Sequence, residues 1–216
     1  MKAVRPNRSH ADSRTQSAVN ILELVATCPR RTLAAGAVLK PADISDVRLC
    51  VVEAGLVVLK SGPPGSARRT ITCHAGSGAL ILAPGSEEVL VALSDAPVRL
   101  ISARERTRLL EAPEAAGALL DALSETLRQK HETIATLARF HHVDRIRETL
   151  VGLARAHGRV GREAIRLDFP LTHELLGEMT GSARETVTRA MDELQRDGFV
   201  ERRGRTYSIH VSPDPL

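Results

Sequence analysis

The sequence lacks the features that mark several protein classes. Its three cysteines, Cys28, Cys50 and Cys73, are odd in number and scattered. With no CxxC pair among them, neither a disulfide framework nor a structural zinc site is expected. No apolar run approaches the ~20 residues that a membrane span needs, and the N-terminal stretch has no signal-peptide core. These absences predict a soluble protein of the cytoplasm that has no membrane partner.

Catalytic signatures are also missing. The sequence contains no GxSxG, no HExxH, no phosphate-binding loop and no dinucleotide fingerprint. A metal-dependent hydrolase built on His141, His142 and Asp144 stays as the enzymatic alternative, although it needs further ligands or a nucleophile from elsewhere. A hinge at these histidines is the other interpretation. We therefore expect no enzyme, no catalytic residue, no cofactor and no metal.

Lysine is scarce, and the basic residues are nearly all arginine, with only four lysines among 30 Lys and Arg. The net charge is +4, and residues 1–15, expected to be a disordered basic tail, carry +3 of it. Residues 138–216 hold thirteen basic and twelve acidic residues. Bulk charge therefore does not indicate nucleic acid, and only the placement of particular arginines could.

At 216 residues the chain is long enough for two small domains. After a short helix expected at 18–25, the segment 32–110 is rich in Val, Leu and Ile and is cut by glycine and proline. Strands are predicted within 48–60, 68–78, 79–85, 88–94 and 98–103. Short strands at this spacing favour a compact β-sandwich or barrel over a mixed α/β fold.

A different pattern begins at Pro113, where the spacing predicts one long helix. Its apolar residues recur at intervals of 3, 4, 7 and 3, interrupted by Lys130. These residues are Leu120, Leu123, Leu127, Ile134 and Leu137. Because the other sides of the run are polar, we favour a symmetric helix–helix dimer over simple intramolecular packing.

The helical spacing continues from Asp144 and ends at His157-Gly158, and a strand is predicted in GREAIRLDF. Thr172 is expected to cap the next helix, in which Gly177 is small enough to let another helix approach. Gly181 can supply a left-handed turn into the helix that follows. The pattern predicts helix, tight turn, helix.

The second helix of that pair is GSARETVTRAMDEL, residues 181–194. Residues ~100° apart place Val187, Ala190 and Leu194 on one side. The opposite side holds Arg184, Glu185, Thr188 and Arg189. The next stretch, FVERRGRTYSIH, predicts a β-hairpin whose tip is crowded by Arg202, Arg203 and Arg205.

Glu185 has three interpretations. It could close a capping box with Ser182, or pair with Arg189 at i,i+4, which is worth ~0.2–0.5 kcal/mol. It could also read base edges together with the arginines, because arginine matches guanine and a carboxylate accepts from the amine of cytosine. The glycine turn before the helix and the basic hairpin after it favour DNA reading.

Residues 171–210, LTHELLGEMTGSARETVTRAMDELQRDGFVERRGRTYSIH, closely resemble the winged helix-turn-helix of the bacterial CRP/FNR transcription regulators. The resemblance covers roughly residues 20–210 and implies an α+β fold. It implies a cyclic-nucleotide-binding-like antiparallel β-roll of jelly-roll type over 16–112, a dimerisation helix and hinge over 113–142, and a DNA-binding domain over 143–216.

The resemblance also implies partners and site residues: a homodimer bound to double-stranded DNA, with RNA polymerase as a further partner. Base contacts are implied for Arg184, Glu185, Thr188 and Arg189, which suggests TGTGA-like half-sites in an inverted repeat one helical turn apart. Phosphate contacts are implied for Ser182, Thr186, Arg202, Arg203 and Arg205. A winged-helix module that binds protein instead of DNA is the alternative.

The sensing part departs from the family. Cyclic-nucleotide binders carry a short helix and an Arg-Ser pair, whereas this chain has GALILAPGSEEVLVALSDAP and no arginine between Arg69 and Arg99. Because a buried phosphate without such a partner is costly, cyclic AMP is not expected. Scattered cysteines exclude an iron–sulfur switch. A haem site at Cys73-His74 is disfavoured, because neighbours in a strand point to opposite faces; a buried cysteine and a surface histidine are expected. No effector is named.

Overall fold

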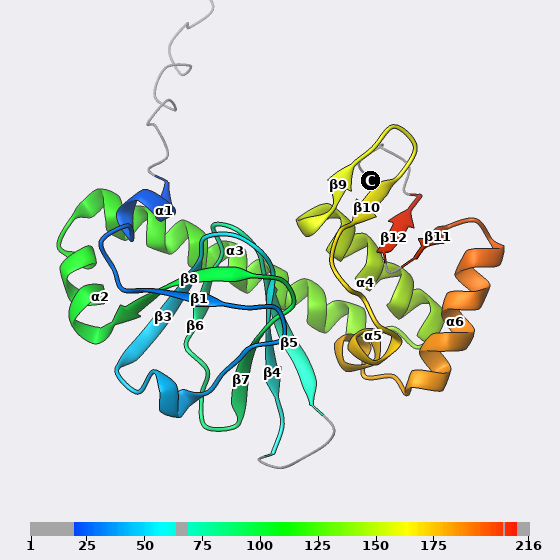
Figure 1. Cartoon of the computed structure of the whole chain (residues 1–216), viewed down its shortest axis with the longest axis horizontal. Helices are drawn as coiled ribbons and strands as arrows, with labels where there is room; N and C mark the ends of the chain where they lie inside the picture. The colour runs from blue at the N-terminus through cyan, green and yellow to red at the C-terminus, as the bar shows by residue number, and fades with distance from the viewer. Residues whose placement is uncertain (1–19, 64–68, 205, 211–216) are drawn as a thin grey trace, which may run out of the picture.

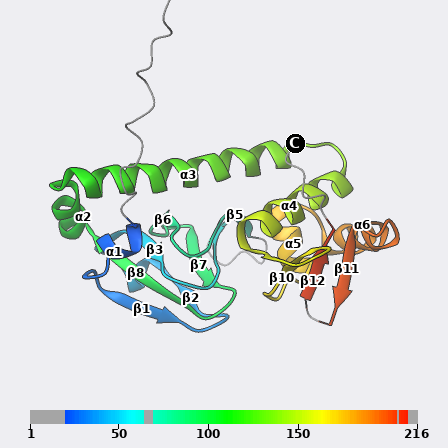
Figure 2. The same ribbon diagram turned by 90° about the horizontal axis from the view of Figure 1, so that it is seen from above.

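A computed structural model describes residues 20–63, 69–204 and 206–210. The predicted tail, residues 1–15, lies outside this range. A β-rich half and a helical half lie side by side, and the long helix α3 runs along both (Figures 1 and 2). The fold is α+β with antiparallel sheets, as predicted.

The N-terminal half is a roll of two four-stranded sheets in the orders β1-β8-β3-β6 and β2-β7-β4-β5. Its strands are β1 Arg30–Leu33, β2 Val38–Leu39, β3 Val47–Val52, β4 Val57–Ser61, β5 Thr70–Ala75, β6 Leu80–Leu82, β7 Glu88–Ala92 and β8 Ala96–Ser102. The stretch 48–60 divides at Gly55, whose φ is 78°. A Cβ there would meet the carbonyl oxygen of Asp95 at 2.2 Å, so glycine makes this turn possible.

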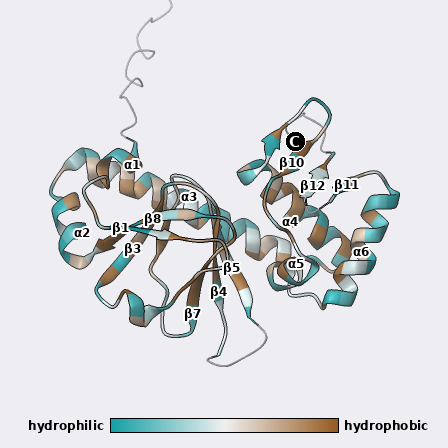
Figure 3. Cartoon of the chain, in the orientation of Figure 1, coloured by the Kyte–Doolittle hydropathy of each residue, from teal (hydrophilic) through white to brown (hydrophobic). Residues whose placement is uncertain are grey.

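Apolar side chains from both sheets fill the roll. The buried cluster includes Leu39, Leu59, Leu90 and Val98, and in Figure 3 the strands are largely hydrophobic whereas α2 and α6 are largely hydrophilic. Each such side chain stabilises the fold by about 1.5–3 kcal/mol relative to exposure. Packing between the sheets therefore holds the roll together.

Two helices of this half differ from the expectation. Helix α1 covers only Ile21–Leu24 of the predicted 18–25, and residues 18 and 19 lie outside the described range. The predicted strand 98–103 ends at Ser102, where α2, Ala103–Leu110, begins. Ser102 and Glu105 form a capping box, with backbone N–H to side-chain distances of 3.2 and 2.7 Å. This local signal starts a helix that we had not predicted. A short 3₁₀ turn spans Pro41–Asp43.

Helix α3, Pro113–Leu137, confirms the predicted long helix. One side packs on the roll through Leu119, which shares a buried cluster with Leu80, and the Thr126 hydroxyl donates to the Leu80 carbonyl at 2.5 Å. The predicted apolar seam faces away from the roll, with Leu120 63% and Ile134 64% exposed. In the described part of the chain, no helix combines the length and apolarity that a membrane span requires.

The C-terminal half packs three helices against a four-stranded sheet in the order β11-β12-β10-β9. Its elements are α4 His142–His157, β9 Arg159–Val160, β10 Ile165–Leu167, α5 His173–Thr180, α6 Arg184–Arg196, β11 Val200–Arg203 and β12 Thr206–Ile209. The strand predicted in GREAIRLDF is shorter, covering only Ile165–Leu167. Ile146, Leu150 and Leu153 of α4 are fully buried in the core.

The two halves share one apolar core. Leu56, Val58 and Ile71, on the outer face of the roll, belong to the same buried cluster as Leu175 and Met179 of α5. Helix α5 packs against β5. At the edge of this contact, Lys60 Nζ lies 2.6 Å from Glu178 Oε2, with both side chains about one-fifth exposed. The helix-turn-helix is thereby held against the roll.

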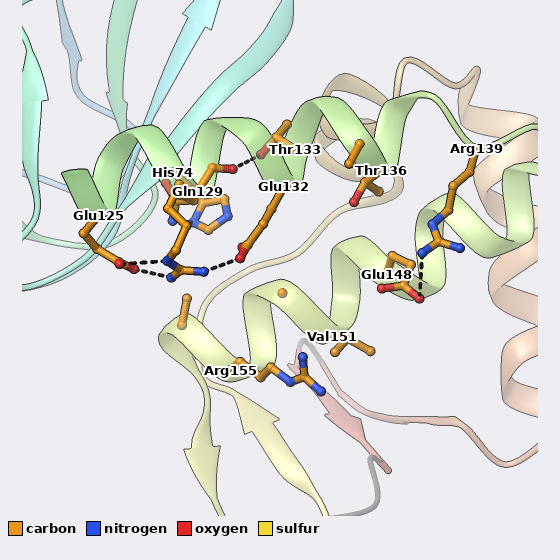
Figure 4. A pocket seen from close by; sticks show the side chains of 14 residues that line it. His74, Glu125, Gln129, Glu132, Thr133, Thr136, Arg139, Glu148, Val151 and Arg155 are labelled. Carbon is orange, nitrogen blue, oxygen red and sulfur yellow. Dashed lines mark hydrogen bonds and ion pairs between the residues drawn. The ribbon is translucent and has the colours of Figure 1, made fainter. Parts of the chain in front are cut away.

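A histidine pair adds a second link. His157, at the end of α4, lies with its Nε2 2.7 Å from His74 Nδ1, and Gln129 of α3 approaches the same atom at 3.1 Å. Figure 4 shows His74 and Gln129 beside a cleft of about 570 Å³ between α3 and α4. Cys73 is buried, as expected. The prediction that His74 lies at the surface is wrong, because α3 and α4 cover the outer face of β5.

The surroundings keep both imidazoles neutral. Burial lowers the pKa of His74 to about 3, with a further contribution from His157, and burial lowers the pKa of His157 to about 4. In the unfolded chain both groups take up protons near pH 6.5. Protons therefore favour the unfolded state over this interval, and stability falls as pH falls.

We expect the free energy of unfolding to drop between pH 8 and pH 5 by up to about 2 kcal/mol for each of these histidines. His157→Gln keeps an amide donor for His74 and removes one titrating group, so its pH dependence should be shallower. Urea denaturation at several pH values measures this. His131→Gln, at an exposed position of α3, is the control, and equal slopes for His157→Gln and wild type would contradict the assignment.

Candidate nucleic-acid interface

Helix α5 begins and ends as the sequence indicates. The Thr172 hydroxyl accepts from the Leu175 N–H at 3.1 Å, which confirms the predicted cap. The helix ends at Gly181, whose φ of 62° is the left-handed conformation expected there. Gly177 allows the close approach, because a Cβ on it would meet the Ser182 carbonyl oxygen at 2.6 Å. These two glycines set the turn between α5 and α6.

Helix α6 has a buried side and an exposed side. Val187, Ala190, Met191 and Leu194 are at most 3% exposed and pack into the core. Arg184, Glu185 and Arg189 are all exposed, and α6 itself lies at the end of the molecule away from the roll in Figure 1. A periodicity of 3.6 thus separates a packing side from a polar side.

The part of the chain that the structure describes contains neither the capping box between Ser182 and Glu185 nor the ion pair between Glu185 and Arg189. The N-cap of α6 is Ala183, not Ser182, and no side chain caps this end. Among the described residues, no ion pair joins Glu185 to Arg189. The carboxylate is therefore free for an outside partner, and the first N–H groups of α6 can donate to an anion.

Thr188 is engaged within the protein. Its hydroxyl donates to the Arg184 carbonyl at 3.0 Å and lies 2.8 Å from Nδ1 of His173. Burial lowers the pKa of His173, and the charges of Arg202 and Arg184 lower it further. When the Thr188 hydroxyl gives its single proton to the Arg184 carbonyl, it accepts from Nδ1 of His173. Thr188 keeps one acceptor lone pair for a base. Sequence reasoning missed His173, because the contact joins two helices.

Ser182 lies half-buried in the turn before α6, and Thr186 lies half-buried in its first turn. The Ser182 hydroxyl is 3.2 Å from Nδ1 of His142, the first residue of α4. This contact connects the α3–α4 junction to the α5–α6 turn. Forty residues separate the two side chains, so no local signal in the sequence could have found it.

His141 and His142 occupy that junction. His141 is the N-cap of α4, and His142 contacts Ser182 and Arg145. Within residues 20–63, 69–204 and 206–210, no three His, Cys, Asp or Glu side chains are grouped to hold a metal ion. The metal-dependent alternative therefore has no ligand set in this range.

The hairpin β11–β12 forms the predicted wing beside α6. Val200, Tyr207 and Ile209 are buried, whereas Arg202 and Arg203 are exposed. Arg203 makes a two-point ion pair with Glu201 at 3.0 Å, and Arg202 donates to the Gly204 carbonyl at 3.1 Å. Arg205 lies outside the described residues.

A β-roll, a long helix and a winged helix-turn-helix with a polar exposed face follow one another along the chain, and this order resembles that of bacterial regulators that join a sensing domain to a DNA-binding domain. Comparisons with known proteins agree. The model of the Crp-like helix-turn-helix domain matches residues 144–212.

The relatives are regulators. The chain is 30% identical over 138 residues to the global nitrogen regulator of Synechocystis sp., covering 62% of this chain and 61% of that protein. It is 28% identical over 107 residues to the CRP-like cAMP-activated global transcriptional regulator of Mycobacterium tuberculosis, covering 50% and 48%. The match thus spans about half to three-fifths of these relatives.

Solved structures share the fold. A CooA mutant from Carboxydothermus hydrogenoformans has a TM-score of 0.71 at 18% identity, over 89% of this chain and 90% of that one. FixK2 from Bradyrhizobium japonicum has a TM-score of 0.69 at 20% identity, over 84% and 92%. Residues 144–212 thus match a Crp-like helix-turn-helix domain, and the chain shares the fold of CRP/FNR structures.

Gly177→Ala should destabilise the protein by about 1–3 kcal/mol, because the added methyl forces the α5–α6 turn to shift. Gly152→Ala on α4, where a Cβ would meet nothing within 4 Å, should instead stabilise it by about 1 kcal/mol. Chemical denaturation of both variants measures the difference. Equal effects of the two substitutions would show that Gly177 has no packing role.

Proposed function

We propose that this protein is a sequence-specific DNA-binding regulator that acts as a homodimer on an inverted repeat. One observation carries the proposal: the two guanidiniums and the single carboxylate of α6 are exposed, while the opposite side of the helix is buried. Two exposed wing arginines stand beside this face. Among the residues that the structure describes, Arg184, Glu185 and Arg189 form no ion pair, so this face of α6 suits a ligand with a complementary pattern of charges and hydrogen-bonding groups.

The residue types on the exposed side of α6 suggest which bases it contacts. Arginine offers two donors to O6 and N7 of guanine, and a carboxylate accepts from N4 of cytosine. Arg184, Arg189 and Glu185 together suit adjacent G·C pairs, as in TGTGA-like half-sites. Ser182, Thr186, Arg202, Arg203 and Arg205 would hold phosphates and set the register.

The exposed seam of α3 supports a dimer. Leu120, Leu127 and Ile134 are at least half exposed in the single chain, Leu123 is 36% exposed and Leu137 is half-buried. A second copy of the same helix would cover these side chains and place two α6 helices on one duplex. Contact with RNA polymerase belongs to the same proposal.

Control by cyclic AMP is not part of the proposal. Apolar side chains fill the roll between its sheets, and no arginine between Arg69 and Arg99 could meet a cyclic phosphate. The relative from Mycobacterium tuberculosis is described as cAMP-activated, so the two proteins would differ in their sensing halves.

Replacing Glu185 and Arg203 one at a time should separate base discrimination from phosphate binding. Glu185→Ala should reduce discrimination at one base pair of the half-site by about 1–3 kcal/mol and leave non-specific affinity intact or raised. Arg203→Ala should weaken binding to all duplexes alike and lower the salt slope. Binding titrations on a selected operator and its single-base variants measure both.

The control is Glu193→Ala, at an exposed position on a later turn of α6, which should bind like wild type. The same uniform loss for Glu185→Ala and Arg203→Ala would contradict the separation of roles. Failure of the wild-type chain to select any duplex from a random pool would contradict the proposed function itself.

Leu127→Glu should weaken the dimer, because the symmetry places the change twice in one seam. Losing about 1.5 kcal/mol of burial from each copy corresponds to roughly a hundredfold weaker dimerisation. Light scattering during size-exclusion chromatography measures the mass. Leu110→Glu, at a leucine of α2 that is 51% exposed and off the seam, is the control; a dimer that survives Leu127→Glu unchanged would place the interface elsewhere.

A further inference from the structure

A groove runs between the roll and the start of α6. Its volume is about 440 Å³. On one side lie Arg69 and Thr70, where β5 begins, and on the other side lies the α5–α6 turn with the start of α6. The groove therefore brings one arginine of the roll to the edge of the face formed by Ser182, Arg184 and Glu185.

The position of Arg69 relative to α6 is fixed by the contact between the two halves. Strand β5 packs against α5, and Ile71, two residues after Arg69, is buried in the shared core. The Lys60–Glu178 ion pair, at 2.6 Å, closes the same edge. Arg69 thus moves with the helix-turn-helix as long as this contact holds.

One donor atom of the Arg69 guanidinium is unsatisfied. Its Nη1 is buried without a hydrogen-bond partner, and no ion pair of the described residues includes Arg69. Glu174, Glu178 and Glu185 also line the groove, but Glu178 is paired with Lys60. An acceptor from outside the chain would satisfy Nη1 once the half-buried side chain turns toward the groove, because this atom is covered in the free protein.

We propose that Arg69 is a further DNA-binding residue, supplied by the roll, that binds a backbone phosphate flanking the half-site read by α6. This inference rests on the proposed function. A phosphate fits better than a base, because Arg69 adjoins the uncapped start of α6 and the turn residue Ser182, where the backbone of the duplex would pass. The roll then takes part directly in DNA binding.

The test measures affinity against salt for the full-length protein. Arg69→Ala should reduce the slope of log K against log salt by about 0.9, the value for one phosphate. The ratio of wild-type to variant affinity should then be about three- to fourfold larger at 50 mM than at 200 mM salt. The loss should be equal on operator and unrelated duplex, and Arg69→Lys, which keeps the charge, should retain most of the slope.

The matched control is Arg106→Ala. Arg106 is exposed and belongs to α2, at the opposite end of the molecule from α6 (Figure 1). Its slope should equal that of the wild type. Ethylation interference compares modified with unmodified DNA for the same protein, so its result does not depend on the stability of the variant. Ethylating one phosphate outside the half-site should weaken binding of the wild type and not of Arg69→Ala.

The outcomes separate the two proposals. If the wild type selects an operator through Arg184 and Glu185 but Arg69→Ala keeps the full slope, the role of Arg69 is wrong and the proposed function stands. If the wild type selects no duplex, both are wrong. Stabilisation of the free protein by inorganic phosphate at millimolar concentration, lost in Arg69→Ala, would assign the groove to a small anion instead of DNA and overturn the inference.

Discussion

The packing of one side of α6 against α4 and α5 is the constraint on which the rest depends. Val187, Ala190, Met191 and Leu194 are buried there, so the helix cannot rotate without exposing them. The residues between them must therefore face outward. Burial of one side of α6 in the core is therefore enough to keep Arg184, Glu185 and Arg189 on the exposed side.

The same reasoning extends from the helix to the whole chain. Glycine at 177 and 181 joins α5 to α6 at close range, and α5 in turn packs on the outer face of the roll. The exposed seam of α3 lies on another side of the molecule. One apolar core thus orients the charged face of α6, while the apolar seam of α3 stays exposed.

Local signals explain how much the sequence could predict. The cap at Thr172, the left-handed turn at Gly181 and the two sides of α6 depend on residues a few positions apart, and the structure has them as expected. The start of α2 was missed, although the Ser102–Glu105 capping box was available as a signal. The exposed position expected for His74 was wrong, because α3 and α4 reach it from 55 and 83 residues away. Contacts between the halves leave no periodic trace in the sequence.

The shared core also bears on how such proteins diversify. Leu175 and Met179 lie in one buried cluster with Leu56, Val58 and Ile71 of the roll, so separating the two halves would expose these side chains to water. If this half were joined to a different N-terminal domain, the apolar surface formed by Leu175 and Met179 would be exposed to water unless the new domain covered it with apolar side chains. A different N-terminal half would therefore need an apolar surface that matches the one formed by Leu56, Val58 and Ile71.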